Sequence, residues 1–72
     1  MQTINIKPPF ITLGQLLKFL GIASGGGDIK VLVKELKITI NDEHDDRRGR
    51  KCYPGDVVHV PKHGTWKITC ED

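Results

Sequence analysis

The sequence predicts an α+β domain in which two helices pack on a small antiparallel β-sheet. Apolar residues recur at helical spacing in residues 13–20 and again in residues 29–36. Short runs rich in β-branched residues precede and follow these segments, separated by Gly, Pro, Asn and Asp. With 72 residues, the chain forms a single domain spanning residues 1–72. A domain of this size buries only about 60 % of its unfolded surface, which leaves little room for a deep substrate pocket.

The first elements are a strand and a helix. Thr3–Lys7 alternates polar and apolar residues, with Ile4 and Ile6 on one face, and is expected to stop at Pro8-Pro9. Thr12 is the expected N-cap of the first helix, and Gly21 is its expected C-terminal stop. The buried positions of this helix are Leu13, Leu16, Leu17 and Leu20.

A second helix follows the segment Ser24-Gly25-Gly26-Gly27-Asp28. Its buried stripe is Ile29, Leu32, Val33 and Leu36. Lys30, Lys34 and Lys37 are predicted to share another face of this helix. Like charges at these spacings repel each other slightly, so the arrangement brings no structural benefit.

The second half of the chain reads as strands joined by turns. Ile38–Ile40 is a short strand, and Asn41-Asp42 is suited to a turn with positive φ. Tyr53–Asp56 is a turn by composition. The remaining predicted strands are Val57–Val60 and Trp66–Cys70, the second with Trp66, Ile68 and Cys70 on its core face.

Charge is unevenly distributed along the chain. The formal net charge is only +2, from 11 basic and 9 acidic residues. However, Asp42, Glu43, Asp45 and Asp46 are followed at once by Arg47-Arg48-Gly49-Arg50-Lys51. If the two runs face different ways, the molecule is strongly dipolar, and if they fold together, the charges pair.

A basic loop held between strands is a fixed cluster of positive charge, which can match phosphate spacing with little ordering cost. Gly49 is expected to let the backbone bend so that neighbouring guanidinium groups face one groove. Lys18, beside Gln15 on the first helix, could extend the same surface. Ser24, Gly26 and Gly27 could hold a phosphate at the start of the second helix. Nucleic acid is therefore the first partner to consider.

Other chemistries find little support. No Ser or Cys has an evident base partner, so no catalytic residue is predicted. Cys52, His59, His63 and Cys70 lack the Cys-x-x-Cys spacing of a zinc knuckle, so no metal or cofactor is expected.

Residues 1–6 carry no apolar leader core and no run is long enough to span a membrane, which predicts a cytoplasmic protein with reduced thiols. Trp66 is expected to pack in the core, whereas Tyr53 could either pack or stack on a base.

The ordered motifs Thr12–Lys18, Ser24–Gly27, Lys30, Ile38–Asn41, Arg47–Lys51 and Tyr53–Val58 resemble a known module. The chain is similar to short stand-alone bacterial members of the αL RNA-binding motif family, a domain named after the fourth ribosomal protein of the small subunit. The resemblance covers about residues 11–60. It implies a two-helix platform followed by strands, structured RNA as the ligand, most plausibly ribosomal, and no enzymatic activity or small-molecule substrate.

The family's basic positions correspond to Lys30 and Lys34 on the second helix, and to Arg47, Arg48, Arg50 and Lys51 in the following hairpin segment. The chain departs from many members at Leu36 and Asp42, where they have Gly, and at Thr12, where they have a basic residue.

A different class of function stays open on the sequence alone. The protein could be a protein-interaction adaptor that uses the acidic run Asp42–Asp46 or the edge of strand Thr3–Lys7.

Overall fold

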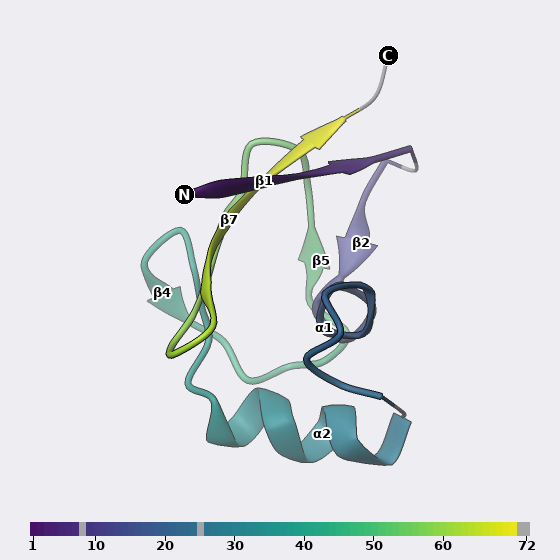
Figure 1. Cartoon of the computed structure of the whole chain (residues 1–72), viewed down its shortest axis with the longest axis vertical. Helices are drawn as coiled ribbons and strands as arrows, with labels where there is room; N and C mark the ends of the chain where they lie inside the picture. The colour runs from purple at the N-terminus through teal and green to yellow at the C-terminus, as the bar shows by residue number, and fades with distance from the viewer. Residues whose placement is uncertain (8, 25, 71–72) are drawn as a thin grey trace.

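The computed structural model describes residues 1–7, 9–24 and 26–70. Pro8 and Gly25, which belong to the predicted strand stop and the predicted glycine segment, lie outside the described residues. In chain order the elements are β1 (Gln2–Ile6), β2 (Ile11–Thr12), α1 (Leu13–Phe19), α2 (Gly26–Glu35), β3 (Thr39–Ile40), β4 (Glu43–His44), β5 (Lys51–Cys52), β6 (Val57–Val60) and β7 (Gly64–Cys70). In Figure 1, α2 lies at the bottom of the molecule, and α1 lies above it, below β2 and β5.

The main sheet has five strands in the order β1-β7-β6-β3-β4. The pairs β6–β7, β3–β6 and β3–β4 are antiparallel, as expected for strands joined by short turns. In contrast, β1 runs parallel to β7, with Ile4 opposite Ile68. The α+β class is confirmed, but the sheet is mixed rather than wholly antiparallel. The two parallel strands come from opposite ends of the chain, so the rest of the domain forms the long connection that parallel pairing requires.

A second, two-stranded sheet connects the N-terminal part of the chain to its middle. In this sheet β2 pairs antiparallel with β5, Ile11 opposite Cys52 and Thr12 opposite Lys51. Strands of two residues are too short to produce a periodic pattern, so the sequence did not predict them. Figure 1 shows β2 and β5 side by side above α1.

The first helix begins and ends close to its predicted bounds. Thr12 is the N-cap and forms a capping box with Gln15, in which each side chain accepts from the other residue's backbone N–H. Gly21 follows the helix with φ of 76°, a conformation that glycine adopts without steric cost. The last helical residue is Phe19, and Leu20 is the C-cap.

The second helix presents part of its predicted stripe to the core. Ile29 and Val33 are buried, whereas Leu32 and Leu36 are half-buried and pack at the margin. The helix ends at Glu35, and Lys37 lies beyond it with φ of 53°. The prediction that Lys37 shares the helical face of Lys30 and Lys34 is therefore wrong.

The core fills the space between the two helices and the inner face of the main sheet. Trp66 is only 7 % exposed, which confirms its predicted packing role. Cys70 is exposed at the last position of β7, so its predicted core position is wrong. The buried core residues are Ile4, Ile6, Leu13, Leu16, Leu17, Ala23, Ile29, Val33, Ile38, Ile40, Cys52, Val58, Val60, Trp66 and Ile68.

The turn after β3 confirms its prediction and fixes a later turn as well. Asn41 and Asp42 have φ of 53° and 70°, so Asp42 adopts the geometry for which many relatives of the resembled family use glycine. The side-chain Nδ2 of Asn41 donates to the Asp56 carboxylate over 3.0 Å, and the side-chain Oδ1 of Asn41 accepts from the backbone N–H of Val57 over 2.9 Å. Asp56 in turn accepts from the Tyr53 amide over 2.8 Å, so the backbone at Tyr53 is held in place.

No helix among the described residues is both long enough and apolar enough to cross a membrane.

Candidate nucleic-acid interface

The basic segment is attached to the first turn of α1. The amide of Leu13 donates to the carbonyl of Arg50, and the amide of Gly14 donates to the carbonyl of Arg48, both over 2.8 Å. These are first-turn N–H groups, which have no partner inside the helix. The β2–β5 pairing holds the same segment through Lys51. The predicted loop between strands is thus a docked structure whose charges are fixed relative to α1.

Gly14 is the point where α1, α2 and the basic segment meet. A Cβ at this position would lie 3.0 Å from Ile29 Cγ2 and 3.3 Å from the carbonyl oxygen of Arg48. The close approach therefore requires a residue without a side chain.

Gly49 has a different role from the predicted one. It does not adopt a positive φ, and a Cβ there would meet no atom within 4 Å. The bend is an ordinary turn, in which the Arg50 amide donates to the Arg47 carbonyl over 3.2 Å.

The acidic and basic runs fold together at one residue, Asp45. Its side chain is 6 % exposed, and its carboxylate accepts from Arg47 Nη2 and from Arg50 Nη1, each over 2.8 Å. It also accepts from Arg47 Nε over 3.1 Å and from the Arg47 amide over 2.9 Å. The hydrogen bonds from the Arg47 side chain hold the pKa of Asp45 well below its usual range, against the opposing effect of burial. The same contact raises the pKa of Arg47.

Asp45 therefore orders two of the predicted arginines and neutralises part of their charge. The Arg47 side chain is still 70 % exposed and that of Arg50 is 27 % exposed. Within residues 1–7, 9–24 and 26–70, neither Arg48 nor Lys51 forms an ion pair, and neither do the exposed Asp42, Glu43 and Asp46. The sequence allowed the acidic and basic runs either to face different ways or to pair with each other. Both occur in part, because Asp45 pairs with two arginines and the other carboxylates remain at the surface.

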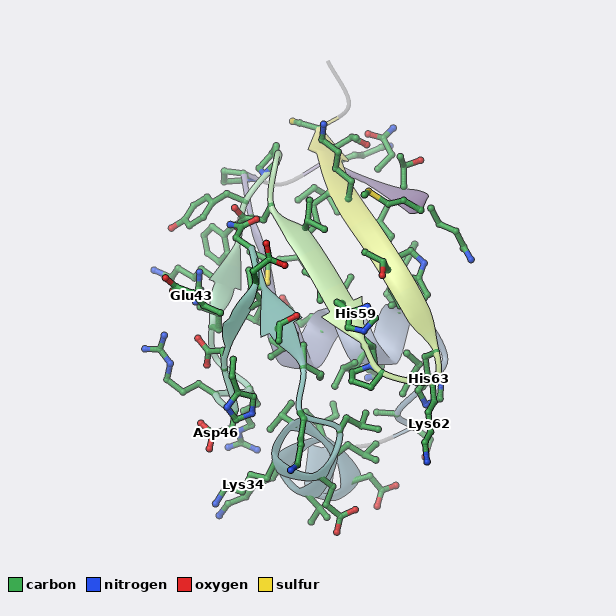
Figure 2. All side chains as sticks on the ribbon, turned by 90° about the vertical axis from the view of Figure 1, so that its left-hand side faces the viewer. Lys34, Glu43, Asp46, His59, Lys62 and His63 are labelled. Atoms are coloured by element: carbon green, nitrogen blue, oxygen red, sulfur yellow. The ribbon has the colours of Figure 1, made fainter. Side chains whose placement is uncertain are left out.

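Helix α2 separates its charges. The basic and acidic residues lie on opposite sides of the buried positions, Lys30 and Lys34 on one side and Asp28 and Glu35 on the other. Figure 2 shows Lys34 on the same side of the molecule as Asp46, which immediately precedes the basic segment. Lys62 lies on the opposite side in this view. The lysine side of α2 thus faces the same way as the start of the basic segment.

Three shallow grooves form a continuous surface around the basic segment. The helix groove is lined by Thr12, Gly14, Gln15, Ile29, Arg48 and Gly49. The arginine groove is lined by Arg47, Gly49, Arg50, Lys51 and Tyr53. The aromatic groove is lined by Phe10, Ile11, Gln15, Lys18 and Phe19. Gly49 belongs to the first two grooves and Gln15 to the first and third, so the three adjoin one another.

The charge of this basic surface, meaning the three grooves together, differs from that of grooves elsewhere. No described Asp or Glu lines any of the three. A groove on the other side of α2 includes Asp28, and a groove on the sheet includes Asp42. Cations line these grooves and no described carboxylate does, which is the charge distribution of a surface for polyanions.

The predicted phosphate position at the start of α2 lies apart from the basic surface. Ser24 Oγ donates to Asp28 Oδ2 over 3.3 Å, and both residues line the groove on the acidic side of α2. Gly26 and Gly27 form the first turn of the same helix. The carboxylate of Asp28 is itself an anion in that first turn, where it would compete with a phosphate. Phosphate binding at Ser24, Gly26 and Gly27 stays a prediction.

Sequence reasoning missed two residues of the surface, Phe10 and Phe19. Phe19 falls on the outer side of α1, where the leucine pattern alone placed polar residues, and this offset was the available signal. Phe10 has no periodic context at all, since it precedes a two-residue strand. In addition, the described residues contain no group of three His, Cys, Asp or Glu side chains suited to a metal ion.

Fold and surface together define a class: a small α+β domain that carries a helix pair and a docked basic segment on one side. Comparison with known proteins identifies the family. The chain belongs to the S4 domain family, whose model matches residues 4–69. It is 43 % identical over 65 residues to the "probable ribosome maturation protein RlbA" of Bacillus subtilis (strain 168), a match that covers 90 % of this chain and 92 % of the relative.

Proposed function

We propose that this S4 domain binds structured RNA through its basic surface, that the RNA is ribosomal, and that the protein acts as a binding module without enzymatic activity. The observation that carries the proposal is a set of adjoining grooves that are lined by cations and by no described carboxylate. The family membership and the similarity to a probable ribosome maturation protein of Bacillus subtilis support ribosomal RNA as the class of ligand.

In this proposal the cations have different roles. Arg48 and Lys51 bind phosphates directly, because they form no ion pair in the described structure. Arg47 and Arg50 present the remaining donors of guanidinium groups that Asp45 already holds in position. Lys18 extends the surface along α1, and Lys30 and Lys34 extend it along α2. Backbone phosphates then provide most of the affinity, while the shape of the folded RNA provides selectivity.

Salt dependence tests the electrostatic core of the proposal. Binding of naked ribosomal RNA, and of purified small and large ribosomal subunits, is measured by filter retention at increasing salt. With about 5 to 7 phosphate contacts, affinity falls steeply as salt rises. A flat dependence on salt rules the proposal out.

A double variant locates the site. Arg48→Gln with Lys51→Gln is expected to weaken binding and to lower the salt slope by about two, one for each lost contact. The control is Lys62→Gln with Lys67→Gln, which removes two exposed charges that line none of the three grooves and is expected to change neither the affinity nor the salt slope. Equal losses in both variants would mean that binding follows net charge alone. Retention of a protein partner after nuclease treatment, without RNA, would favour the adaptor alternative.

A further inference from the structure

The aromatic groove carries a feature that phosphate binding does not explain. Phe10 and Phe19 both line it, together with Ile11 at its base. Phe19 is 68 % exposed, an unusual position for a side chain that would gain substantial free energy from burial. The neighbouring Tyr53 is 48 % exposed and packs against Phe10 with ring centroids 5.8 Å apart. Three of the chain's aromatic side chains therefore gather on one side of the basic segment.

Cations surround these rings. The ammonium group of Lys51 lies 5.1 Å from the centroid of the Phe10 ring, a cation–π contact, and Lys18 lines the aromatic groove itself. Through Gln15, this groove adjoins the helix groove that Arg48 lines. Aromatic faces bordered by cations fit a group that combines a flat π-system with a phosphate.

Phe10 and the turn that carries Tyr53 are held by the fold. The turn that carries Tyr53 is bound to β7, since the Gly55 amide donates to the Ile68 carbonyl over 2.7 Å and the Ile68 amide donates to the Asp56 carbonyl over 2.9 Å. Phe10 is fixed by its contacts with Tyr53 and Lys51 and by the following strand β2. A ligand that stacks on Phe10 need not order that side chain first, which favours binding.

We propose that the aromatic groove receives one unpaired nucleobase of the bound RNA, stacked against Phe10 and Phe19, while Lys18 and Lys51 hold the adjoining phosphates. This inference rests on the proposed function and refines it. The ligand would be a folded RNA with a bulged, looped or terminal nucleotide next to a paired segment. A base is favoured over an apolar protein segment because Lys18 lines the aromatic groove, Lys51 contacts the Phe10 ring, and no described carboxylate lines this groove or the two related grooves.

The test uses two short RNA hairpins of equal stem sequence. One carries a single bulged 2-aminopurine, a fluorescent adenine analogue, and the other is fully paired. The full-length protein is expected to bind the bulged hairpin about 5- to 150-fold more tightly, given the usual contribution of one stacked base. Emission of the bulged 2-aminopurine is expected to fall on binding, because stacking on an aromatic ring quenches it.

Two variants and a control assign the effect to the groove. Phe19→Ala removes a largely exposed ring, so the fold is expected to persist. It should reduce the affinity for the bulged hairpin to that for the paired one and abolish the quenching. Phe10→Leu keeps an apolar side chain at a half-buried position and should act in the same direction. Val31→Ala, which truncates a 51 % exposed apolar residue on α2 outside the three grooves, should change neither affinity.

The outcomes separate this inference from the proposed function. Salt-dependent binding of both hairpins with equal affinity would overturn the inference and leave RNA binding intact. Unchanged affinities in Phe19→Ala and Phe10→Leu would also overturn it, and would leave the groove to a protein partner. Failure to bind either hairpin or ribosomal RNA at low salt would overturn both proposals.

Discussion

Replacing Asp45 by Asn is expected to destabilise the domain markedly, although the change removes only one charge from a charged surface segment. The carboxylate is 6 % exposed and accepts from the guanidinium groups of Arg47 and Arg50. An asparagine keeps one acceptor for the Arg47 amide but turns a donor toward a cation. Most of the loss in free energy of unfolding comes from the hydrogen bond with Arg50, whose side chain is 27 % exposed. The bond with Arg47 contributes less, because water screens that exposed side chain.

One partly buried hydrogen bond between charged groups contributes about 2 kcal/mol. For a domain of this size, that free energy corresponds to a fall in Tm of about 8 to 16 °C. Thermal unfolding followed by circular dichroism measures it. The matched control is Asp46→Asn, which makes the same chemical change at the next residue, where the side chain is exposed and forms no ion pair in the described structure. The control is expected to stay within about 0.5 kcal/mol of the original protein.

The dependence on pH gives the same prediction a second test. The pKa of Asp45 is lowered in the folded protein from its ordinary value of 3.8, so below that pH the unfolded chain binds the proton first. The stabilising contribution is therefore complete well above pH 4 and is lost as the pH falls below it. The difference in stability between the original protein and Asp45→Asn should shrink over that acidic range. Equal Tm values for Asp45→Asn and Asp46→Asn at neutral pH would refute the reasoning.

Two further variants test the local structure. Gly14→Ala should destabilise the domain by about 1 kcal/mol, because crowding against Ile29 and the carbonyl of Arg48 outweighs the gain in helix propensity. Gly49→Ala should leave the free energy of unfolding unchanged, and urea unfolding compares the two variants. A Gly14→Ala variant that is more stable than the original protein would contradict the close packing. Thr12→Ala removes the capping box of α1 and should lower the free energy of unfolding by about 1 kcal/mol, whereas Thr12→Ser should keep most of that stability. Equal urea midpoints for the two variants would show that the cap contributes little.

Much of the fold and the location of the basic segment could be predicted from the sequence because their signals are local. The leucine spacing placed α1, Thr12 and Gly21 marked its ends, and Asn41-Asp42 marked a turn with positive φ. The roles predicted for Lys18, Lys30, Lys34, Arg48 and Lys51 remain proposals, but the structure gathers Lys18, Arg48 and Lys51 along adjoining grooves. The glycine segment before α2 could not be placed in this way. Its sequence suggested a phosphate position, but it did not show that Ser24 would lie on the acidic side of α2, apart from the basic surface.

By itself, the sequence determined the class of fold, the positions of the main helices and strands, and the density of charge in residues 42–51, because periodicity and turn chemistry act over a few residues. Tertiary structure alone decided that Asp45 would be the carboxylate that is buried, that β1 would run parallel to β7, and that Phe10 would meet Tyr53. Each of these depends on which distant segments pack together. The burial of Asp45 follows from the path of the chain between β4 and β5, where it docks on α1, and no pattern among neighbouring residues encodes that path.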